Sequence, residues 1–218
     1  LLIFPPWINK YYILDLRKEN SFIRWAVGQG HTVFIISWVN PDTKLADKTF
    51  EDYMIEGPLA ALDAIEQATG ENKINAVGYC IGGTLLASTL AYMAAKKDER
   101  IKSATFFTTM VDFEDAGELG VFIDEEQITS LENKMDEKGY LASTHMASTF
   151  NMMRGNDLIW NYVVRNYLLG EDYTAFDLLH WNGDVTNLPA KWHQQYLQQL
   201  YRDNLLVKPG KLEALGVP

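Results

Sequence analysis

Four short runs of apolar residues constrain the fold of this chain more than any other feature. They are residues 1–4, 32–38, Ile74–Tyr79 and 101–110, and a segment with a helical pattern separates each run from the next. Strands of a parallel sheet are buried on both faces, so they read as continuous apolar runs rather than as an alternating pattern. Strands that alternate with helices indicate a parallel sheet covered on both faces. We therefore predict a doubly wound α/β core over residues 1–110.

Three segments between these runs carry helix signals. Residues 21–27 start at a capping serine and are followed by glycines, and residues 50–69 have apolar side chains at helical spacing. Gly57-Pro58 lies inside the second segment, where a kink or a restart is expected because proline removes a backbone donor. Residues 82–95 are small and apolar, which suits close packing against a sheet.

The pattern changes after Met110. Residues 111–206 show no clear strand, and they contain an acidic helix-like stretch at 124–138 and several aromatic residues. We interpret them as a mostly helical cap or lid inserted on the sheet, and residues 207–218 as the start of a return to the core. The chain begins inside a predicted buried strand and ends in a loop-like segment, so we expect a fragment truncated at both ends.

Charge and composition argue against several classes of protein. The chain has 19 basic and 29 acidic residues and a net charge of −10, which disfavours a nucleic-acid surface. Its apolar runs are far shorter than the roughly 20 residues of a membrane-spanning helix. The single cysteine excludes an internal disulfide and a multi-cysteine metal site, and it fits a reducing, cytoplasmic setting.

The third apolar run leads into Gly-x-Cys-x-Gly at residues 78–82. This is the pattern of a nucleophile elbow with Cys80 as the nucleophile, because the glycines leave room at a strained turn between strand and helix. The Ile81 N–H would face an acyl oxyanion at the positive end of the helix, and the helix end should lower the pKa of the thiol. The alternative is a buried structural cysteine, the usual state of a free cysteine.

A second oxyanion donor in such folds comes from the loop after an earlier strand. Here that loop is residues 5–10, in which two prolines restrict the backbone. Trp7 or Ile8 would offer the N–H, and we select Ile8 as the candidate. The alternative is a rigid turn with Trp7 packed beside the core, and the sequence leaves both open.

Other polar residues are weaker candidates. The elbow fold places its catalytic histidine last in the chain, so we interpret His31 as structural. We interpret the histidines of the predicted cap as surface or packing residues, and their spacing predicts no metal site; they are His145, His180 and His193. Asp184 either lies near a substrate channel or stabilises a turn, and the turn is favoured. Asp112 and Asp115 follow the fourth apolar run, and a structural role is favoured there too.

The predicted cap is rich in aromatic side chains. They form either a cap core, or the wall of an apolar tunnel, or a surface that docks a partner subunit or polymer. The residues are Trp160, Tyr162, Trp181, Trp192 and Tyr196. The acidic stretch 124–137 is interpreted as a solvated face, with a mobile part of a lid as the alternative.

Several longer segments resemble polyhydroxyalkanoate (PHA) synthases. The elbow at residues 78–84, GYCIGGT, is similar to the cysteine-containing, lipase-like box of that family. Further similar segments are residues 5–16, 29–34, 37–42, 161–167, 176–189 and 209–212. The resemblance covers essentially the whole chain, which is identified as a central part of the catalytic domain.

The resemblance implies an α/β-hydrolase fold with a helical cap, and an acyltransferase that polymerises (R)-3-hydroxyacyl groups from coenzyme A. Cys80 would take the acyl group as a thioester, coenzyme A would leave, and the hydroxyl of another hydroxyacyl unit would attack the thioester. Coenzyme A is then part of the substrate, and no cofactor or metal is expected. The resemblance also implies a cytoplasmic homodimer at the surface of PHA granules, with the growing polyester as partner.

The family's catalytic aspartate and histidine find no match within residues 1–218, because the resemblance places them on loops after later strands. If this chain were the whole molecule, we would expect it to be inactive or nearly so. Two alternative functions stay open. One is a cysteine-dependent thioesterase or hydrolase in which water accepts the acyl group, although a long cap would shield the thioester from water. The other is a non-catalytic, granule-associated fragment.

Overall fold

A computed structural model describes residues 1–173 and 177–218, and it confirms the predicted α/β core. Four parallel strands form one sheet in the order β2-β1-β3-β4. Their bounds are Leu2–Phe4 (β1), Phe34–Ile35 (β2), Ile74–Tyr79 (β3) and Ile101–Phe107 (β4). β1 and β3 are the inner strands, because each has a paired neighbour on both sides.

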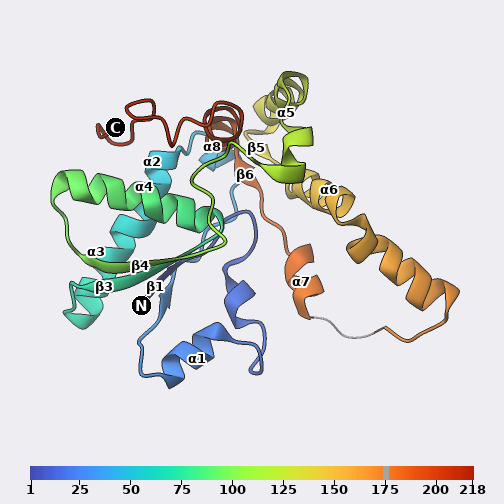
Figure 1. Ribbon diagram of the computed structural model, residues 1–218, viewed down its shortest axis with the longest axis horizontal. Helices are drawn as coiled ribbons and strands as arrows, with labels where there is room; N and C mark the ends of the chain where they lie inside the picture. Colours follow the sequence, from blue (N-terminus) through green and yellow to red (C-terminus); the bar gives the residue numbers. More distant parts are fainter. Residues whose placement is uncertain (174–176) are drawn as a thin grey trace.

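Four helices connect these strands. They are α1 (Phe22–Gly28), α2 (Phe50–Met54), α3 (Ala60–Thr69) and α4 (Ile81–Lys96), with short turns at Tyr11–Asp15 and Thr43–Leu45. Figure 1 shows α2, α3 and α4 on one face of the sheet and α1 on the other. Ser21 caps α1, since its Oγ accepts a hydrogen bond of 2.8 Å from the Arg24 N–H. A wide π-helical turn, Ile55–Leu59, contains Pro58 and joins α2 to α3, which confirms the predicted kink.

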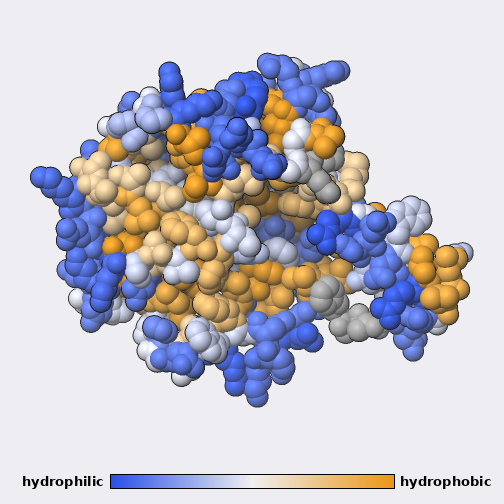
Figure 2. Space-filling view, viewed as in Figure 1, coloured by the Kyte–Doolittle hydropathy of each residue, from blue (hydrophilic) through white to orange (hydrophobic). Residues whose placement is uncertain are grey.

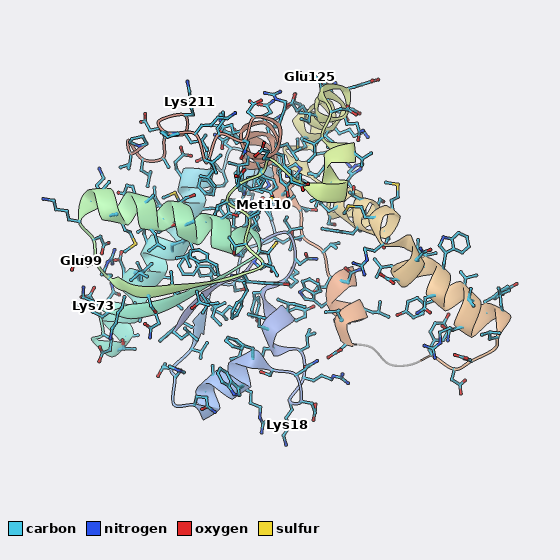
Figure 3. The ribbon with its side chains drawn as sticks, viewed as in Figure 1. Lys18, Lys73, Glu99, Met110, Glu125 and Lys211 are labelled. Atoms are coloured by element: carbon cyan, nitrogen blue, oxygen red, sulfur yellow. The ribbon has the colours of Figure 1, made fainter. Side chains whose placement is uncertain are left out.

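Two apolar clusters stabilise the molecule. The first lies between the sheet and helices α3 and α4, and it includes the fully buried Leu2 and Leu86. In the second, residues of the core meet residues of the cap, and Ile81 of α4 belongs to the same cluster as Leu188. Figure 3 shows the side chains of this junction around the labelled Met110. The cap therefore shares its apolar packing with the core.

Two strands are less buried than their sequences predict. The run 32–38 forms only the two-residue strand β2, whose residues are half-buried. β2 is an edge strand, so it lacks the second neighbour that a fully buried strand has. β4 is the other edge, and several of its residues are exposed: Lys102, Ser103, Thr105 and Phe106. The predicted cover on both faces of the sheet is therefore wrong for β4.

Residues 111–206 are mostly helical, as predicted. The helices are α5 (Glu125–Lys138), α6 (Ser143–Met153), α7 (Asp177–Gly183) and α8 (Ala190–Gln195), and further helical turns cover Gly117–Phe122, Asn156–Trp160, Val163–Leu168 and Tyr196–Arg202. The prediction of no strand here is wrong, because β5 (Tyr140–Leu141) pairs antiparallel with β6 (Leu188–Pro189). Strands of two residues are too short to show an alternating pattern.

One part of the cap projects away from the sheet, and we call it the arm (residues 156–169). Figure 1 shows the arm extending from the end of α6, and Figure 2 shows hydrophobic residues at its tip. Trp160, Tyr167 and Leu168 are among its exposed apolar side chains. α5 is different, because it turns the buried Ile128 and Met135 inward and leaves most of its acidic side chains in solvent, in agreement with the predicted solvated face.

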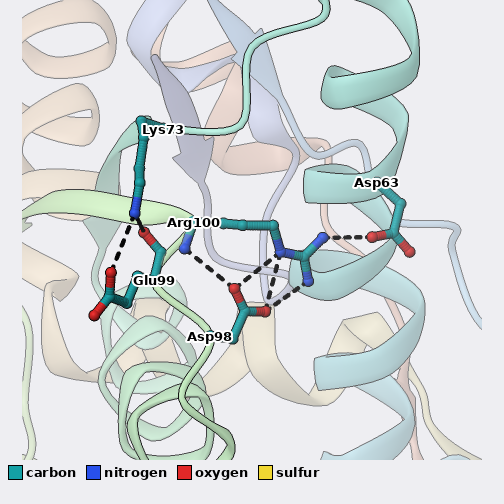
Figure 4. A network of polar contacts seen from close by, with 5 residues as sticks. All are labelled: Asp63, Lys73, Asp98, Glu99 and Arg100. Atoms are coloured by element: carbon teal, nitrogen blue, oxygen red, sulfur yellow. Dashed lines mark hydrogen bonds and ion pairs between the residues drawn. The ribbon is translucent and has the colours of Figure 1, made fainter.

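An ion-pair network fixes the amino ends of β3 and β4 (Figure 4). The Arg100 guanidinium lies 2.7 Å from Asp98 Oδ2 and 2.5 Å from Asp63 Oδ1 of α3. Lys73, just before β3, donates to the backbone carbonyl of Glu99 at 2.8 Å. These contacts lie at the end of the sheet opposite to Cys80, so we assign them a structural role.

No helix in the part of the chain that the structure describes combines the length and the apolar character needed to cross a membrane. The same residues hold no cluster of three or more histidine, cysteine, aspartate or glutamate side chains that would suit a metal ion.

Candidate active site

Cys80 lies at a sharp turn between β3 and α4. β3 ends at Tyr79 and α4 begins at Ile81, so a single residue makes the turn. Cys80 has φ 55° and ψ −128°, a backbone conformation that residues other than glycine rarely adopt. Its N–H donates to the Phe107 carbonyl of β4 at 2.9 Å, which ties the strained turn to the sheet. The strand–turn–helix geometry predicted for an elbow is present.

The glycines of the elbow are required by close approaches of the backbone. A Cβ on Gly78 would lie 2.5 Å from the Cα of Gly83, so β3 and α4 pack backbone to backbone at this point. A Cβ on Gly82 would collide with the carbonyl of Phe4 at the end of β1. The spacing of glycines around the cysteine therefore has a steric cause, and α4 begins directly against the loop that follows β1.

The Cys80 side chain is exposed, although protein atoms surround much of its sulfur. This burial raises the pKa of the thiol, and a hydrogen bond from the Ile81 N–H lowers it by less. The expectation that the helix end lowers the thiol pKa is therefore wrong in net direction, because desolvation outweighs it. The alternative of a buried structural cysteine does not fit an exposed residue.

Two tyrosines from a distant part of the chain lie near the cysteine. The Tyr196 hydroxyl donates to the Tyr201 hydroxyl at 3.2 Å, and both rings pack edge-on against Phe113. Burial raises the pKa of both tyrosines, and the charge of a Cys80 thiolate raises it further. Both hydroxyls therefore stay protonated at neutral pH. The sequence places Tyr196 among the cap aromatics but carries no signal for this hydroxyl pair beside the cysteine.

The loop after β1 is rigid. Trp7 is 3% exposed and packs among three aromatic rings. They are Trp38, Tyr53 and Trp192. Trp38 also donates from Nε1 to the Pro5 carbonyl at 3.0 Å. Ile8 is half-buried and packs on the cluster that contains Ile81. Trp7 therefore packs in the core, as one of the two interpretations of this loop expected, and the Ile8 N–H stays the candidate for the second oxyanion donor.

The four histidines do not meet at the thiol. His31 and His180 are exposed, and His145 is half-buried on α6. His193 is buried on α8 beside Tyr196, and burial lowers its pKa to about 4, so its ring is neutral at pH 7. In the ranges 1–173 and 177–218, no histidine forms a hydrogen bond with the cysteine sulfur. The interpretation of these histidines as surface or packing residues agrees with this placement.

The candidate aspartates have structural partners. Asp184 accepts a hydrogen bond of 2.7 Å from the Tyr12 hydroxyl. Asp112 accepts one of 2.8 Å from Asn204 Nδ2, which lowers the pKa of the carboxyl. Asp115 accepts a bond of 3.1 Å from a backbone N–H two residues further on. These contacts agree with the structural roles favoured for all three.

The five aromatic residues singled out in the cap do not form one cluster. Trp192 and Tyr196 are buried in the core–cap junction. Trp181 is half-buried and donates from Nε1 to a carbonyl of the loop 5–10 at 2.8 Å. Trp160 and Tyr162 lie on the arm, where Trp160 is 59% exposed. The interpretation of these five residues as one cap core is therefore wrong, because two of them lie on the arm, away from the others.

Two protein-family models match the chain. The model described as "Poly-beta-hydroxybutyrate polymerase (PhaC) N-terminus" matches residues 1–26, and the model described as "alpha/beta hydrolase fold" matches residues 21–215. The second match covers most of the chain and agrees with the sheet and the elbow. Phe176, the first residue of the segment 176–189 that resembles PHA synthases, lies outside the described residues.

Several curated relatives are similar over almost the whole chain. The chain is 60% identical to the poly(3-hydroxyalkanoate) polymerase subunit PhaC of Rhizobium meliloti (strain 1021), over 95% of this chain and 34% of that protein. It is 59% identical to the poly(3-hydroxyalkanoate) polymerase of Methylorubrum extorquens over the same shares, and 46% identical to subunit PhaC of Cupriavidus necator, over 100% of this chain and 38% of that protein. The chain spans about a third of the length of the first of these relatives. They confirm the resemblance to PHA synthases, and the chain belongs to the α/β-hydrolase fold family.

Proposed function

We propose that the protein carrying this sequence is an acyltransferase that polymerises (R)-3-hydroxyacyl-coenzyme A into polyhydroxyalkanoate through Cys80. The observation behind the proposal is the elbow. The only cysteine of the chain is exposed at the strained turn between β3 and α4, in a sequence 60% identical to a poly(3-hydroxyalkanoate) polymerase subunit. A nucleophile at such a turn is held at the carboxyl end of the sheet, beside backbone N–H donors.

In the first step, the Cys80 thiolate attacks the thioester carbonyl of the substrate. A carbon–sulfur bond to the enzyme forms, and the carbonyl oxygen takes a negative charge that the N–H groups of Ile81 and Ile8 would stabilise. When the carbonyl reforms, the bond to coenzyme A breaks, and coenzyme A leaves as a thiolate that takes up a proton. The acyl group is then a thioester on Cys80.

In the second step, the 3-hydroxyl of another hydroxyacyl unit attacks this thioester. An ester bond forms, the bond to Cys80 breaks, and the hydroxyl proton passes to a base. The raised pKa of Cys80 means that its thiol also needs a base at neutral pH. We assign neither proton to the histidines of this chain, because none of those in the described ranges bonds to the sulfur.

The surroundings of Cys80 favour a hydroxyl over water as the acceptor. Phe113 and Tyr196 belong to the same buried cluster as Ile81 at the junction of core and cap, and Tyr201 packs on both rings. Cys80 itself is exposed, so these side chains shield a thioester from water on one side. This supports the polymerase against a thioesterase, in which water would accept the acyl group.

The test is coenzyme A release from (R)-3-hydroxybutyryl-coenzyme A by the whole protein that carries this sequence. Cys80→Ala should lower the rate by at least about 10³-fold, since it removes the nucleophile. Gly28→Ala, at a position with open space around it, is the control and should keep the rate. Coenzyme A release at the original rate by Cys80→Ala would refute the proposal.

The product separates the proposal from its alternatives. A polymerase yields insoluble polyester, whereas a thioesterase yields free hydroxy acid in the same amount as the released coenzyme A. A non-catalytic, granule-associated protein would show neither product and no acyl label on Cys80. Either of these last two results would overturn the polymerase.

We also propose that the protein acts in the cytoplasm as a homodimer at the surface of a polyester granule. The exposed apolar side chains of the arm support a partner of this kind, because monomeric proteins rarely expose large contiguous apolar patches. The arm side chains in question are Ile159, Trp160, Val164, Tyr167, Leu168 and Leu169. Sedimentation analysis with and without polyester granules tests the homodimer and the granule association.

A further inference from the structure

Thr186 of the cap is a buried polar residue that contacts the candidate oxyanion loop. It lies between α7 and β6 and is 3% exposed. Its Oγ1 lies 2.5 Å from the carbonyl oxygen of Trp7 and 2.8 Å from that of Ile8. A hydroxyl has a single proton to donate, so the two carbonyls share it. One side chain of the cap therefore contacts two consecutive peptide groups of this loop, next to the antiparallel backbone bridge between Asn9 and Val185.

These contacts fix the direction of the Ile8 N–H. The structure contains no cis peptide bond in the described residues, so the N–H of Ile8 points away from the carbonyl of Trp7 and from Thr186. No acceptor for this N–H is found among residues 1–173 and 177–218. Ile8 also packs on the cluster that contains Ile81. This N–H belongs to the loop that meets the start of α4 at Gly82, beside the carbonyls of Phe4 and Pro5.

The cap segment that carries Thr186 is itself attached to the core. We call the following contacts the latch. They join Trp181 Nε1 to the Lys10 carbonyl (2.8 Å), the Tyr12 hydroxyl to Asp184 (2.7 Å), and Arg17 and Asn20 to Asp177 (2.7 and 2.8 Å). Every partner in the core lies within residues 10–20, which follow the loop directly. The latch therefore holds the Thr186 hydroxyl close to the two carbonyls that it contacts.

We propose that Thr186 is a positioning residue that directs the Ile8 N–H at the acyl oxygen of the Cys80 thioester. The cap then completes the oxyanion hole of the core in addition to covering it. This inference rests on the proposed function, because it needs an acyl group on Cys80. It adds to that function the element that orients the second donor.

The experiment compares Thr186→Val with Thr186→Ser in the whole protein. Valine keeps the shape of threonine and removes the hydroxyl, so it should lower kcat for coenzyme A release between about 10-fold and 100-fold with little change in KM. Serine keeps the hydroxyl and should restore most of kcat. Alkylation of Cys80 by iodoacetamide forms no oxyanion, so its rate should be the same in both variants and in the unmodified protein.

Thr89→Val is the matched control for the loss of a buried hydroxyl. Thr89 is fully buried on α4 and donates to the Leu85 carbonyl at 2.7 Å, away from the loop. Thr89→Val should lower the melting temperature by about as much as Thr186→Val does, and it should leave kcat unchanged. The inference is overturned if Thr186→Val keeps kcat, or if it slows alkylation as much as turnover without rescue by serine. Turnover by Cys80→Ala would instead refute the proposed function itself, so the two failures are distinguishable.

Discussion

The core and the cap segment 177–186 are held in place by different kinds of contact. The core is stabilised by side chains such as Leu2, Leu62 and Leu86, which are removed from water almost completely. Residues 177–186 of the cap are held to the core by the latch and by Thr186, whose contacts are hydrogen bonds or ion pairs between distant parts of the chain. Among the described residues, the arm adds no side chain to either apolar cluster, and it exposes Trp160.

This difference means that one kind of contact stabilises the site and another kind orients its groups. Apolar burial is large in energy and weak in direction, whereas hydrogen bonds contribute about 1 kcal/mol each but require specific atoms in specific directions. The core therefore sets where the sulfur of Cys80 lies, and the polar contacts of the cap set how the loop beside it is oriented. The predictions below test this division.

The largest effect is expected at the elbow, inside the core. Gly82→Ala places a Cβ into the carbonyl of Phe4, where backbone meets backbone and neither side can rotate away. We expect a loss of more than about 3 kcal/mol in the free energy of unfolding. Gly28→Ala meets nothing within 4 Å and should change stability by less than about 1 kcal/mol. Urea unfolding of the two variants checks this, and equal values would contradict the close packing of β1 and α4.

The same division explains how much could be predicted from the sequence. β3 has the predicted bounds, and α4 begins one residue before its predicted start at residue 82. Both predictions succeed because apolar runs, small residues and glycines determine structure over short distances in the sequence. The nucleophile candidate Cys80 follows from the same local pattern. The predicted strand 32–38 is too long, since only the neighbours of β2 in the sheet decide that it is an edge.

The other parts of the site depend on contacts between distant residues. The pairing of Tyr196 with Tyr201 beside Cys80, and of Thr186 with the loop 5–10, follows no spacing rule within one segment. The predicted direction of the shift in the thiol pKa is wrong because it, too, depends on contacts between distant residues. The helix end is local, but the burial that outweighs it comes from the whole surroundings of the sulfur.

A second comparison sets a buried core residue against a buried cap residue. Leu62→Ala on α3 and Met135→Ala on α5 both empty fully buried sites, so each should cost about 2–5 kcal/mol. Met135 belongs to the cluster that joins core and cap. We therefore expect Met135→Ala to lower the hydrogen-exchange protection of α4 as well as that of α5. Loss of protection confined to residues 111–206 would show that the cap unfolds as a separate unit.

The latch should depend on pH in a defined direction. Burial and the hydrogen bond to Asp184 raise the pKa of Tyr12 to about 12, from an ordinary value of about 10. The stabilisation is therefore fully present below pH 10 and is lost as the pH rises from 10 towards 12. Tyr12→Phe should cost about 1 kcal/mol at pH 8 and progressively less above pH 10. Unfolding of both proteins across this range measures the difference, and a constant difference would rule out the contact.

The smallest effect is expected on the arm. Trp160 is 59% exposed, so Trp160→Ala should change the free energy of unfolding by no more than about 0.5 kcal/mol. Trp25 on α1 is the matched control in the core, because it is 58% exposed and should respond equally little. The two changes in the free energy of unfolding should differ only if another surface buries the arm and leaves α1 exposed. A cost above about 1.5 kcal/mol at Trp160 that grows with protein concentration would mean that a second copy buries the arm, since a monomer has no concentration-dependent term. That outcome would make association with a second copy the main support of the arm.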